Sequence, residues 1–107
     1  MSFPFAKRAV DIFRKRIEGS PHRRAFNSIY GGSPLGRLSI AFKKKYLKVY
    51  TRDQSADAEK ILKERLSPVI AVTPWGSENT KNSGFTFTIE TAEQFEHFLR
   101  AVGDSSA

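Results

Sequence analysis

Apolar and polar positions alternate most clearly within residues 37–52, and this alternation predicts a β-hairpin. Apolar residues hold every second position in both halves of the segment: Leu38, Ile40, Phe42, Leu47 and Val49. The halves are separated by a lysine run, Lys43, Lys44 and Lys45. The alternating positions of the second half hold Tyr46, Lys48, Tyr50 and Arg52. Because side chains of a strand point to alternate faces, one face of the hairpin is apolar and the other combines tyrosines with cations.

Apolar residues at three- and four-residue spacing predict three helices, over residues 2–18, 53–67 and 91–103. The expected core stripes are Ala6, Ala9, Val10, Phe13 and Ile17 in the first helix, Ala58, Ile61, Leu62 and Leu66 in the second, and Phe95, Phe98, Leu99 and Val102 in the third. Asp53 or Ser55 is a suitable N-cap for the second helix. Thr91 with Gln94 has the pattern of a capping box for the third helix.

Two further segments have strand patterns. Residues 69–73 are almost continuously apolar, which is typical of a central or fully buried strand. Residues 85–90 alternate Phe, Phe and Ile with polar residues, which predicts a strand with one core face. The polar residues 74–84 between them predict a loop, in which Trp75 either covers the edge of the core or is an exposed contact residue.

The least regular part of the chain is residues 22–37. Residues 25–30 fit either a short strand or one helical turn, and the glycine-rich residues 31–36 predict a loop. That loop has neither the Lys-Ser or Lys-Thr ending of a phosphate-binding loop nor the GxGxxG spacing of a dinucleotide site.

Together these elements predict a single α+β domain over residues 1–107, with an antiparallel sheet of about four strands and three helices packed mainly on one face. Residues 104–107 are expected to form a disordered tail. The core is expected to combine strand and helix residues: Leu38, Ile40, Phe42, Leu47, Val49, Phe85, Phe87, Ile89, Phe13, Ile17, Leu62, Phe95, Phe98 and Leu99.

The charge is distributed unevenly along the chain. Residues 1–52 contain 13 Lys or Arg and 2 Asp or Glu, a balance of +11, whereas residues 53–107 contain 5 and 9, a balance of −4. Such an asymmetry indicates a polyanionic partner, with nucleic acid the first choice and an anionic membrane surface the second. A basic surface that serves only solubility is the alternative.

The sequence carries no pattern of a catalytic or metal site. It has no cysteine, and its two histidines, His22 and His97, have no carboxylates at metal-binding spacing. We therefore expect no cofactor and no metal, and a metal-dependent nuclease is the enzymatic alternative. No apolar run is long enough to span a membrane, and the absence of cysteine is compatible with the cytoplasm or another reducing compartment.

The tyrosine face of the hairpin is either an exposed binding surface or a second core face under a helix. If it is exposed, the tyrosines can stack on bases while neighbouring cations meet phosphates. On this interpretation the nucleic-acid contacts come from Arg23, Arg24, Arg37, Lys43, Lys44, Lys45, Tyr46, Lys48, Tyr50 and Arg52.

The pattern of residues 37–103 resembles a known class of small domains. The hairpin LSIAF-KKK-YLKVYTR, the later tryptophan-glycine loop and the strand FTFTIET running into AEQFEHFLRAV are similar to the YjbR-like family and related domains appended to restriction-type proteins. The resemblance implies a double-wing DNA-binding fold, and it leaves residues 1–36 unexplained.

We therefore expect a non-enzymatic nucleic-acid-binding module that binds DNA in preference to RNA, mainly through phosphates. The alternative is a protein-interaction or inhibitor module that docks an acidic partner, with Trp75 or Tyr30 as its anchor. No membrane partner is expected, and nothing in the pattern indicates an oligomeric state.

Overall fold

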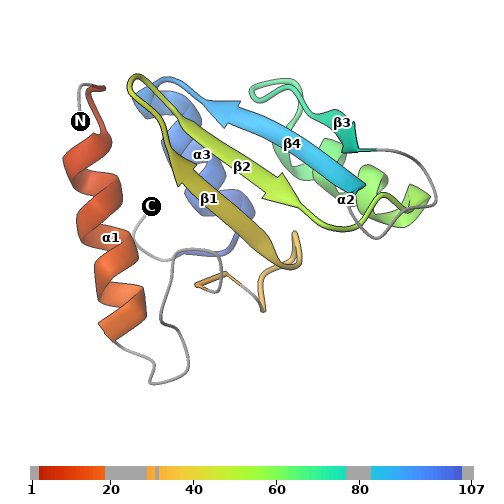
Figure 1. The fold of residues 1–107 in the computed structure, drawn as a ribbon, viewed down its shortest axis with the longest axis horizontal. Helices are drawn as coiled ribbons and strands as arrows, with labels where there is room; N and C mark the ends of the chain where they lie inside the picture. Colours follow the sequence, from red (N-terminus) through yellow and green to blue (C-terminus); the bar gives the residue numbers. More distant parts are fainter. Residues whose placement is uncertain (1–2, 19–28, 31, 77–82, 105–107) are drawn as a thin grey trace.

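The computed structural model describes residues 3–18, 29–30, 32–76 and 83–104, and its elements follow one another as helix, hairpin, helix, two strands and helix (Figure 1). They are α1 (Ala6–Glu18), β1 (Leu38–Phe42), β2 (Leu47–Thr51), α2 (Ala56–Leu66), β3 (Thr73–Gly76), β4 (Ser83–Ile89) and α3 (Ala92–Ala101). The strands form one antiparallel sheet in the order β1-β2-β4-β3. The predicted α+β class is thus confirmed.

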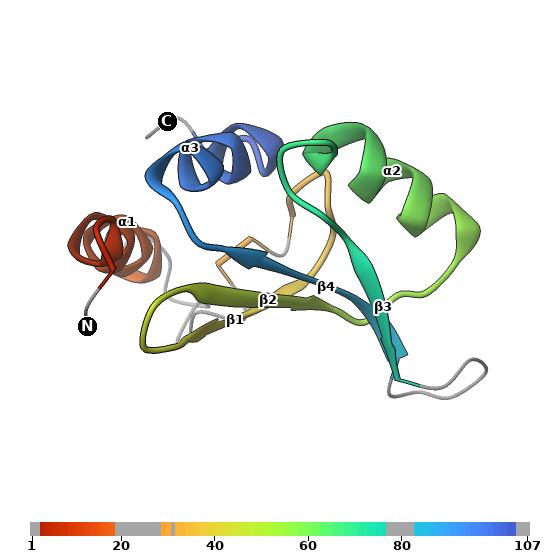
Figure 2. The same ribbon diagram turned by 90° about the horizontal axis from the view of Figure 1, so that it is seen from above.

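The helices lie on one side of the sheet. Figure 2 shows α2 and α3 across one face, with α1 beside α3 and the β1 edge, and no helix among the described residues across the other face. The buried core lies between the sheet and the helices. The fourteen residues expected to form the combined strand and helix core are all either buried or packed against it, whereas the wider helix stripes also named Val10 and Ile61, which are not part of it.

Register explains which residues reach this core. Val49 of β2 lies opposite Ile40 of β1 on one side and Phe87 of β4 on the other. Partners directly opposite each other in an antiparallel pair point to the same face, so the apolar positions of three strands form one surface. The turn between β1 and β2 closes with a hydrogen bond from the Lys43 N–H to the Tyr46 carbonyl at 2.9 Å.

Helix α1 begins later than predicted and buries most of the predicted stripe, with Ile12 in place of Val10. Phe3 and Phe5 precede it and are buried, with their rings stacked on those of Phe42 and Phe95, respectively. Within the helix, Ile12 is buried, whereas Val10 is only half-buried. The helix turns this face inward because it packs against both α3 and the end of β1, where Phe13 meets Phe42 edge to face at a centroid distance of 6.0 Å.

Helix α2 is capped by Ser55, whose hydroxyl accepts a hydrogen bond from the Ala58 N–H at 3.2 Å. Leu62 and Leu66 are fully buried, as predicted. The prediction that Ile61 is a core residue is wrong, because its side chain is 40 % exposed. The predicted stripe was too wide for a helix that covers only one corner of the sheet.

The prediction of a strand over residues 69–73 is wrong, because the strand in this region is β3, Thr73–Gly76. Val69 is 36 % exposed and residues 69–72 belong to no strand, while β3 begins at Thr73 and continues through Pro74 and Trp75, which we expected in a loop. Far from being central, β3 is an edge strand. Proline is tolerated there because its missing N–H can face away from the paired neighbour.

Helix α3 begins at the predicted capping residue Thr91 and ends just before Gly103. The Thr91 hydroxyl accepts from the Gln94 N–H at 3.1 Å, while the Gln94 side chain accepts from the Glu90 N–H at 2.8 Å. At the other end Gly103 adopts a φ of 76°, which lets the Asp104 N–H reach the Leu99 carbonyl at 2.8 Å in a Schellman arrangement. Asp104 is 5 % exposed, so the predicted disordered tail does not include this residue.

Candidate nucleic-acid interface

The sheet face without a helix carries the tyrosine and cation positions of β2. Lys48 and Tyr50 alternate with the buried Leu47 and Val49, so they point away from the core. Both side chains are half-buried by their neighbours on the face, whereas Arg52, just beyond the end of β2, is exposed. The sequence left open whether this face lies under a helix; among the described residues, it does not (Figure 2).

The register of β3 brings Trp75 onto the same face. Trp75 lies opposite Gly84, and Thr73 lies opposite Thr86, which in turn lies opposite Tyr50. The rings of Tyr50 and Trp75 therefore meet across β4, with centroids 5.9 Å apart and planes at 86°. The Arg52 guanidinium carbon lies over the indole at 5.6 Å from its centroid. We call Tyr50, Arg52 and Trp75 the aromatic cluster.

The backbone beneath the aromatic cluster is held by Thr51. Its carbonyl oxygen accepts the Trp75 indole N–H at 2.9 Å, and its buried hydroxyl accepts the Phe85 N–H at 2.9 Å. The Thr51 hydroxyl thus takes the place of a backbone acceptor where β2 leaves β4. Gly84 permits this close approach, because a Cβ there would fall on the Thr51 carbonyl group, 2.6 Å from its carbon and 3.1 Å from the Arg52 Cα.

The side chain of Gln54 fixes β3 and β4 from the helix side. Its amide nitrogen donates to the carbonyl of Trp75 at 3.1 Å and to that of Gly84 at 3.3 Å. Gln54 also lines a hollow of about 620 Å³, together with Ser55, Glu59, Pro74, Gly76, Ser83 and Phe85. The Trp75 side chain is therefore fixed by its indole hydrogen bond, and its backbone by Gln54.

The predicted cations fall into separate groups along the hairpin. Lys43, Lys44 and Lys45 are exposed at the turn, at one end of β2. Arg37 is exposed at the other end, where it lines a hollow of about 200 Å³ together with Arg52. Lys48 lies between these two groups, opposite Thr88.

Tyr46 is not part of the aromatic cluster. It is half-buried at the turn, four residues before Tyr50, which in an extended strand is about 13 Å. Glu90 follows the end of β4 near that turn and is exposed, so it places an acidic group at this end of the face. The aromatic cluster lies at the opposite end, where the cations are Arg37 and Arg52. Arg23 and Arg24, the other two predicted contact residues, lie outside the described residues.

The basic residues of α1 have two different roles. Arg8 forms an ion pair with Glu96 and lies over the Phe95 ring at 5.6 Å, so it holds α1 against α3. Lys7 and Lys15 are exposed and line a separate hollow of about 470 Å³ along the helix. This hollow includes no residue of the hairpin.

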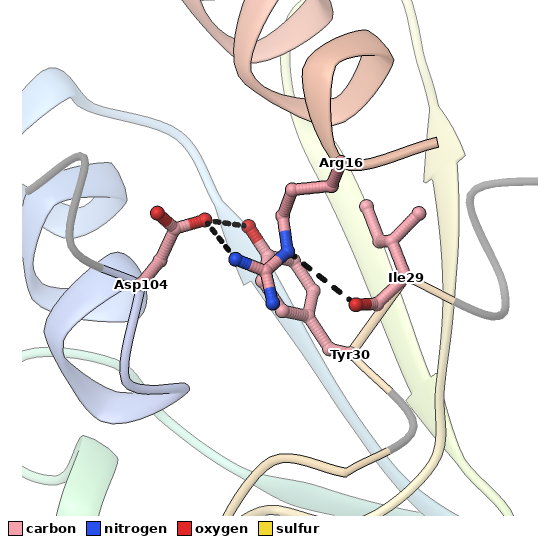
Figure 3. Close-up of polar contacts among 4 residues, drawn as sticks. All are labelled: Arg16, Ile29, Tyr30 and Asp104. Atoms are coloured by element: carbon pink, nitrogen blue, oxygen red, sulfur yellow. Dashed lines mark hydrogen bonds and ion pairs between the residues drawn. The ribbon is translucent and has the colours of Figure 1, made fainter. Parts of the chain in front are cut away.

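Arg16 belongs to a second internal cluster, shown in Figure 3. The Tyr30 hydroxyl donates to the Asp104 carboxylate at 2.7 Å, and an Arg16 guanidinium N–H reaches the same oxygen at 3.4 Å. Arg16 also lies over the Tyr30 ring at 4.6 Å and donates to the Ile29 carbonyl at 3.4 Å. We call Arg16, Tyr30 and Asp104 the polar cluster; it joins α1, residues 29–30 and the end of α3.

Burial raises the pKa of the Tyr30 hydroxyl well above its usual range, and the hydrogen bond to the Asp104 carboxylate adds to this effect. Tyr30 is 1 % exposed, so it is not available as the anchor of a protein interface, and that expectation was wrong. Neither Tyr30 nor Asp104 could be recognised from the sequence as partners, because they are 74 residues apart.

Within the described residues, no group of three or more His, Asp or Glu side chains could hold a metal ion. None of the helices in that part of the chain is long and apolar enough to cross a membrane.

Comparison with known proteins gives no match for this chain. No protein-family model matches it, and neither a curated protein nor a solved structure is significantly similar to it. The resemblance to YjbR-like, double-wing domains therefore stays a prediction, and the function has to be argued from the open sheet face.

Proposed function

We propose that this protein is a non-enzymatic nucleic-acid-binding module that uses the sheet face carrying Lys48, Tyr50, Arg52 and Trp75. The observation that carries the proposal is the aromatic cluster itself: two rings and a guanidinium meet on a face that no described helix covers. Aromatic side chains beside cations are the usual composition of a nucleic-acid-binding surface.

Charge supports the same partner. The half of the chain that supplies β1, β2 and their connection has a balance of +11, from 13 basic and 2 acidic residues. A polyanion is drawn to such a surface, and each phosphate that it neutralises releases counterions and makes binding salt-dependent. Arg37 and the three turn lysines extend the cationic surface along the hairpin, and this arrangement suits a backbone longer than one nucleotide.

The test is binding of labelled mixed-sequence DNA and RNA oligonucleotides, measured by fluorescence anisotropy over a series of salt concentrations. Lys48→Gln removes one charge from the proposed face, and Lys60→Gln removes one from an exposed position on α2 as the matched control. We expect the Lys48 variant to bind more weakly and to reduce the slope of log K against log salt by about 1. The control variant should retain the slope of the wild type.

Absence of binding to every oligonucleotide at low salt would refute the proposal, as would equal slopes for the two variants. The same residue types, Tyr, Trp and Arg, also dominate the hot spots of protein interfaces. An acidic protein partner is therefore the second candidate. A partner that remains bound after nuclease treatment and at moderate salt, and that is lost with Tyr50→Ala, would favour it.

A further inference from the structure

We infer that the preferred ligand is an unpaired, single-stranded segment of nucleic acid, with a base stacked on the aromatic cluster; this inference rests on the proposed function. The rings of Tyr50 and Trp75 can be used by only some forms of nucleic acid. Within a duplex, the faces of the bases are covered by their neighbours, at 3.4 Å along each strand. An aromatic side chain can stack only on a base that has left that stack.

The geometry of the two rings favours one stacked base. Their planes lie at 86°, so a base that lies flat against one ring presents its edge to the other. The Arg52 guanidinium lies over the indole at 5.6 Å from its centroid, which places a cation next to the two rings. A phosphate next to the stacked base can then meet Arg52, or Lys48 on the other side of Tyr50.

The spacing along β2 also fits an extended strand. Lys48, Tyr50 and Arg52 occupy alternate positions, so neighbouring side chains of the face are about 7 Å apart. This spacing is about twice the distance between stacked bases, so an extended backbone can place one nucleotide beside each side chain.

Trp75 is held in place by hydrogen bonds, which lowers the entropy cost of ordering its ring on binding. The indole N–H is fixed on the Thr51 carbonyl at 2.9 Å, and the carbonyls of Trp75 and Gly84 are both held by Gln54. A ring that only covered the core would not need to lie on the face opposite the helices. Trp75 lies on that face and contacts Tyr50 there.

Duplex binding would use a different part of the hairpin. A two-stranded β-ribbon fits the major groove, and the tip of this ribbon carries Lys43, Lys44 and Lys45. Groove insertion therefore depends on the lysine turn and leaves the aromatic cluster outside, whereas stacking depends on Tyr50 and Trp75. The two modes can be separated by which substitutions weaken binding.

The experiment uses Trp75 as its own probe, because the sequence contains one tryptophan. Trp75 fluorescence is titrated with a homothymidine oligonucleotide of about 12 nucleotides, which lies within the usual site size of small single-strand-binding domains. The comparison ligand is a blunt-ended, fully paired duplex of about 12 base pairs, used at equal phosphate concentration. We expect tighter binding of the single strand, with quenching of the indole fluorescence.

Variants then test the stacking surface. Tyr50→Ala should weaken single-strand binding by about 5- to 150-fold, whereas Tyr50→Phe, which keeps the ring, should bind like the wild type. Trp75→Ala and Trp75→Phe form a second pair, read by anisotropy, with circular dichroism as the check that each variant is folded. The pair at Tyr50 keeps the test valid if Trp75→Ala does not fold.

Three outcomes would overturn the inference. The first is equal or tighter binding of the duplex, and the second is single-strand binding with no quenching and no effect of Tyr50→Ala. Both would leave the proposed function intact. If neither ligand binds at low salt, the proposed function fails together with the inference.

Discussion

Trp75 donates its indole N–H to the carbonyl oxygen of Thr51 at 2.9 Å, and this bond joins an edge strand to the end of the central hairpin. It turns the indole toward Tyr50 and Arg52 on the sheet face without a helix. The bond also uses a carbonyl that would otherwise continue the ladder between β2 and β4. The hydroxyl of Thr51 compensates by accepting the Phe85 N–H.

Gly84→Ala tests the close approach of β4 to Thr51. The new methyl group would meet backbone atoms, 2.6 Å from the Thr51 carbonyl carbon and 3.1 Å from the Arg52 Cα, which cannot move without disturbing β2. We expect a loss of about 3 kcal/mol in the free energy of unfolding, measured by urea denaturation. Gly32→Ala is the control, since a Cβ there has no atom within 4 Å, and it should change stability by less than about 0.5 kcal/mol. Equal stability of the two variants would contradict this prediction.

Thr51→Val tests whether the hydroxyl acts as a backbone acceptor. Valine keeps the shape of threonine but leaves the buried Phe85 N–H without its partner. We expect a loss of about 1–3 kcal/mol in unfolding free energy and faster hydrogen exchange at the Phe85 amide. Thr51→Ser keeps the oxygen and should protect that amide as the wild type does. Unchanged protection in the valine variant would show that the hydrogen bond is dispensable.

Asp104→Ala tests the polar cluster at the end of α3. The substitution removes the acceptor of the buried Tyr30 hydroxyl and the anionic partner of Arg16. Thermal or urea unfolding should show a loss of about 1–3 kcal/mol. Asp104→Asn keeps an oxygen acceptor and should lose less. If both variants are as stable as the wild type, Asp104 is not buried against Tyr30 and the prediction is wrong.

The raised pKa of Tyr30 predicts a loss of stability at alkaline pH. Burial and the Asp104 hydrogen bond keep the native hydroxyl protonated, whereas the unfolded chain releases this proton above its ordinary pKa of about 10. The native state then binds more protons than the unfolded state, so stability falls as the pH rises above about 10. At pH 11 this contribution amounts to about 1 kcal/mol relative to pH 8.

The measurement for Tyr30 is urea denaturation at both pH values, compared with Tyr30→Phe. Phenylalanine has no proton to release, so the variant should lack this part of the alkaline destabilisation even though it is less stable at pH 8. An identical pH dependence in the two proteins would contradict the assignment.

Alanine substitutions at Ile61 and Leu62 test which face of α2 is buried. Ile61 is 40 % exposed and Leu62 is 1 % exposed, although both belong to the apolar stripe of the sequence. We expect Ile61→Ala to cost less than about 1 kcal/mol and Leu62→Ala about 2–5 kcal/mol in unfolding free energy. Equal costs would show that both residues are buried.

The amino-acid sequence by itself determined the local parts of this protein. The alternation in residues 37–52 was sufficient to place Leu47 and Val49 in the core and Lys48 and Tyr50 on the opposite face, because a strand has a period of two. Thr91 marked the start of α3, and Ser55 was one of two candidate caps for α2, because a cap needs only its own next turn. The uneven charge was equally visible without a structure.

Only the tertiary structure decided which of these features meet. Whether the Tyr50 face is open depends on where the helices pack, and Trp75 reaches it through the register of residues 73–76 against residues 83–86. Val69 is exposed and β3 lies at an edge because strand order is set by pairing across the whole sheet, not by local hydrophobicity. Tyr30 and Asp104 likewise meet through tertiary packing, because they are 74 residues apart in the sequence. The periodicity of a single helix or strand does not show which elements pack together.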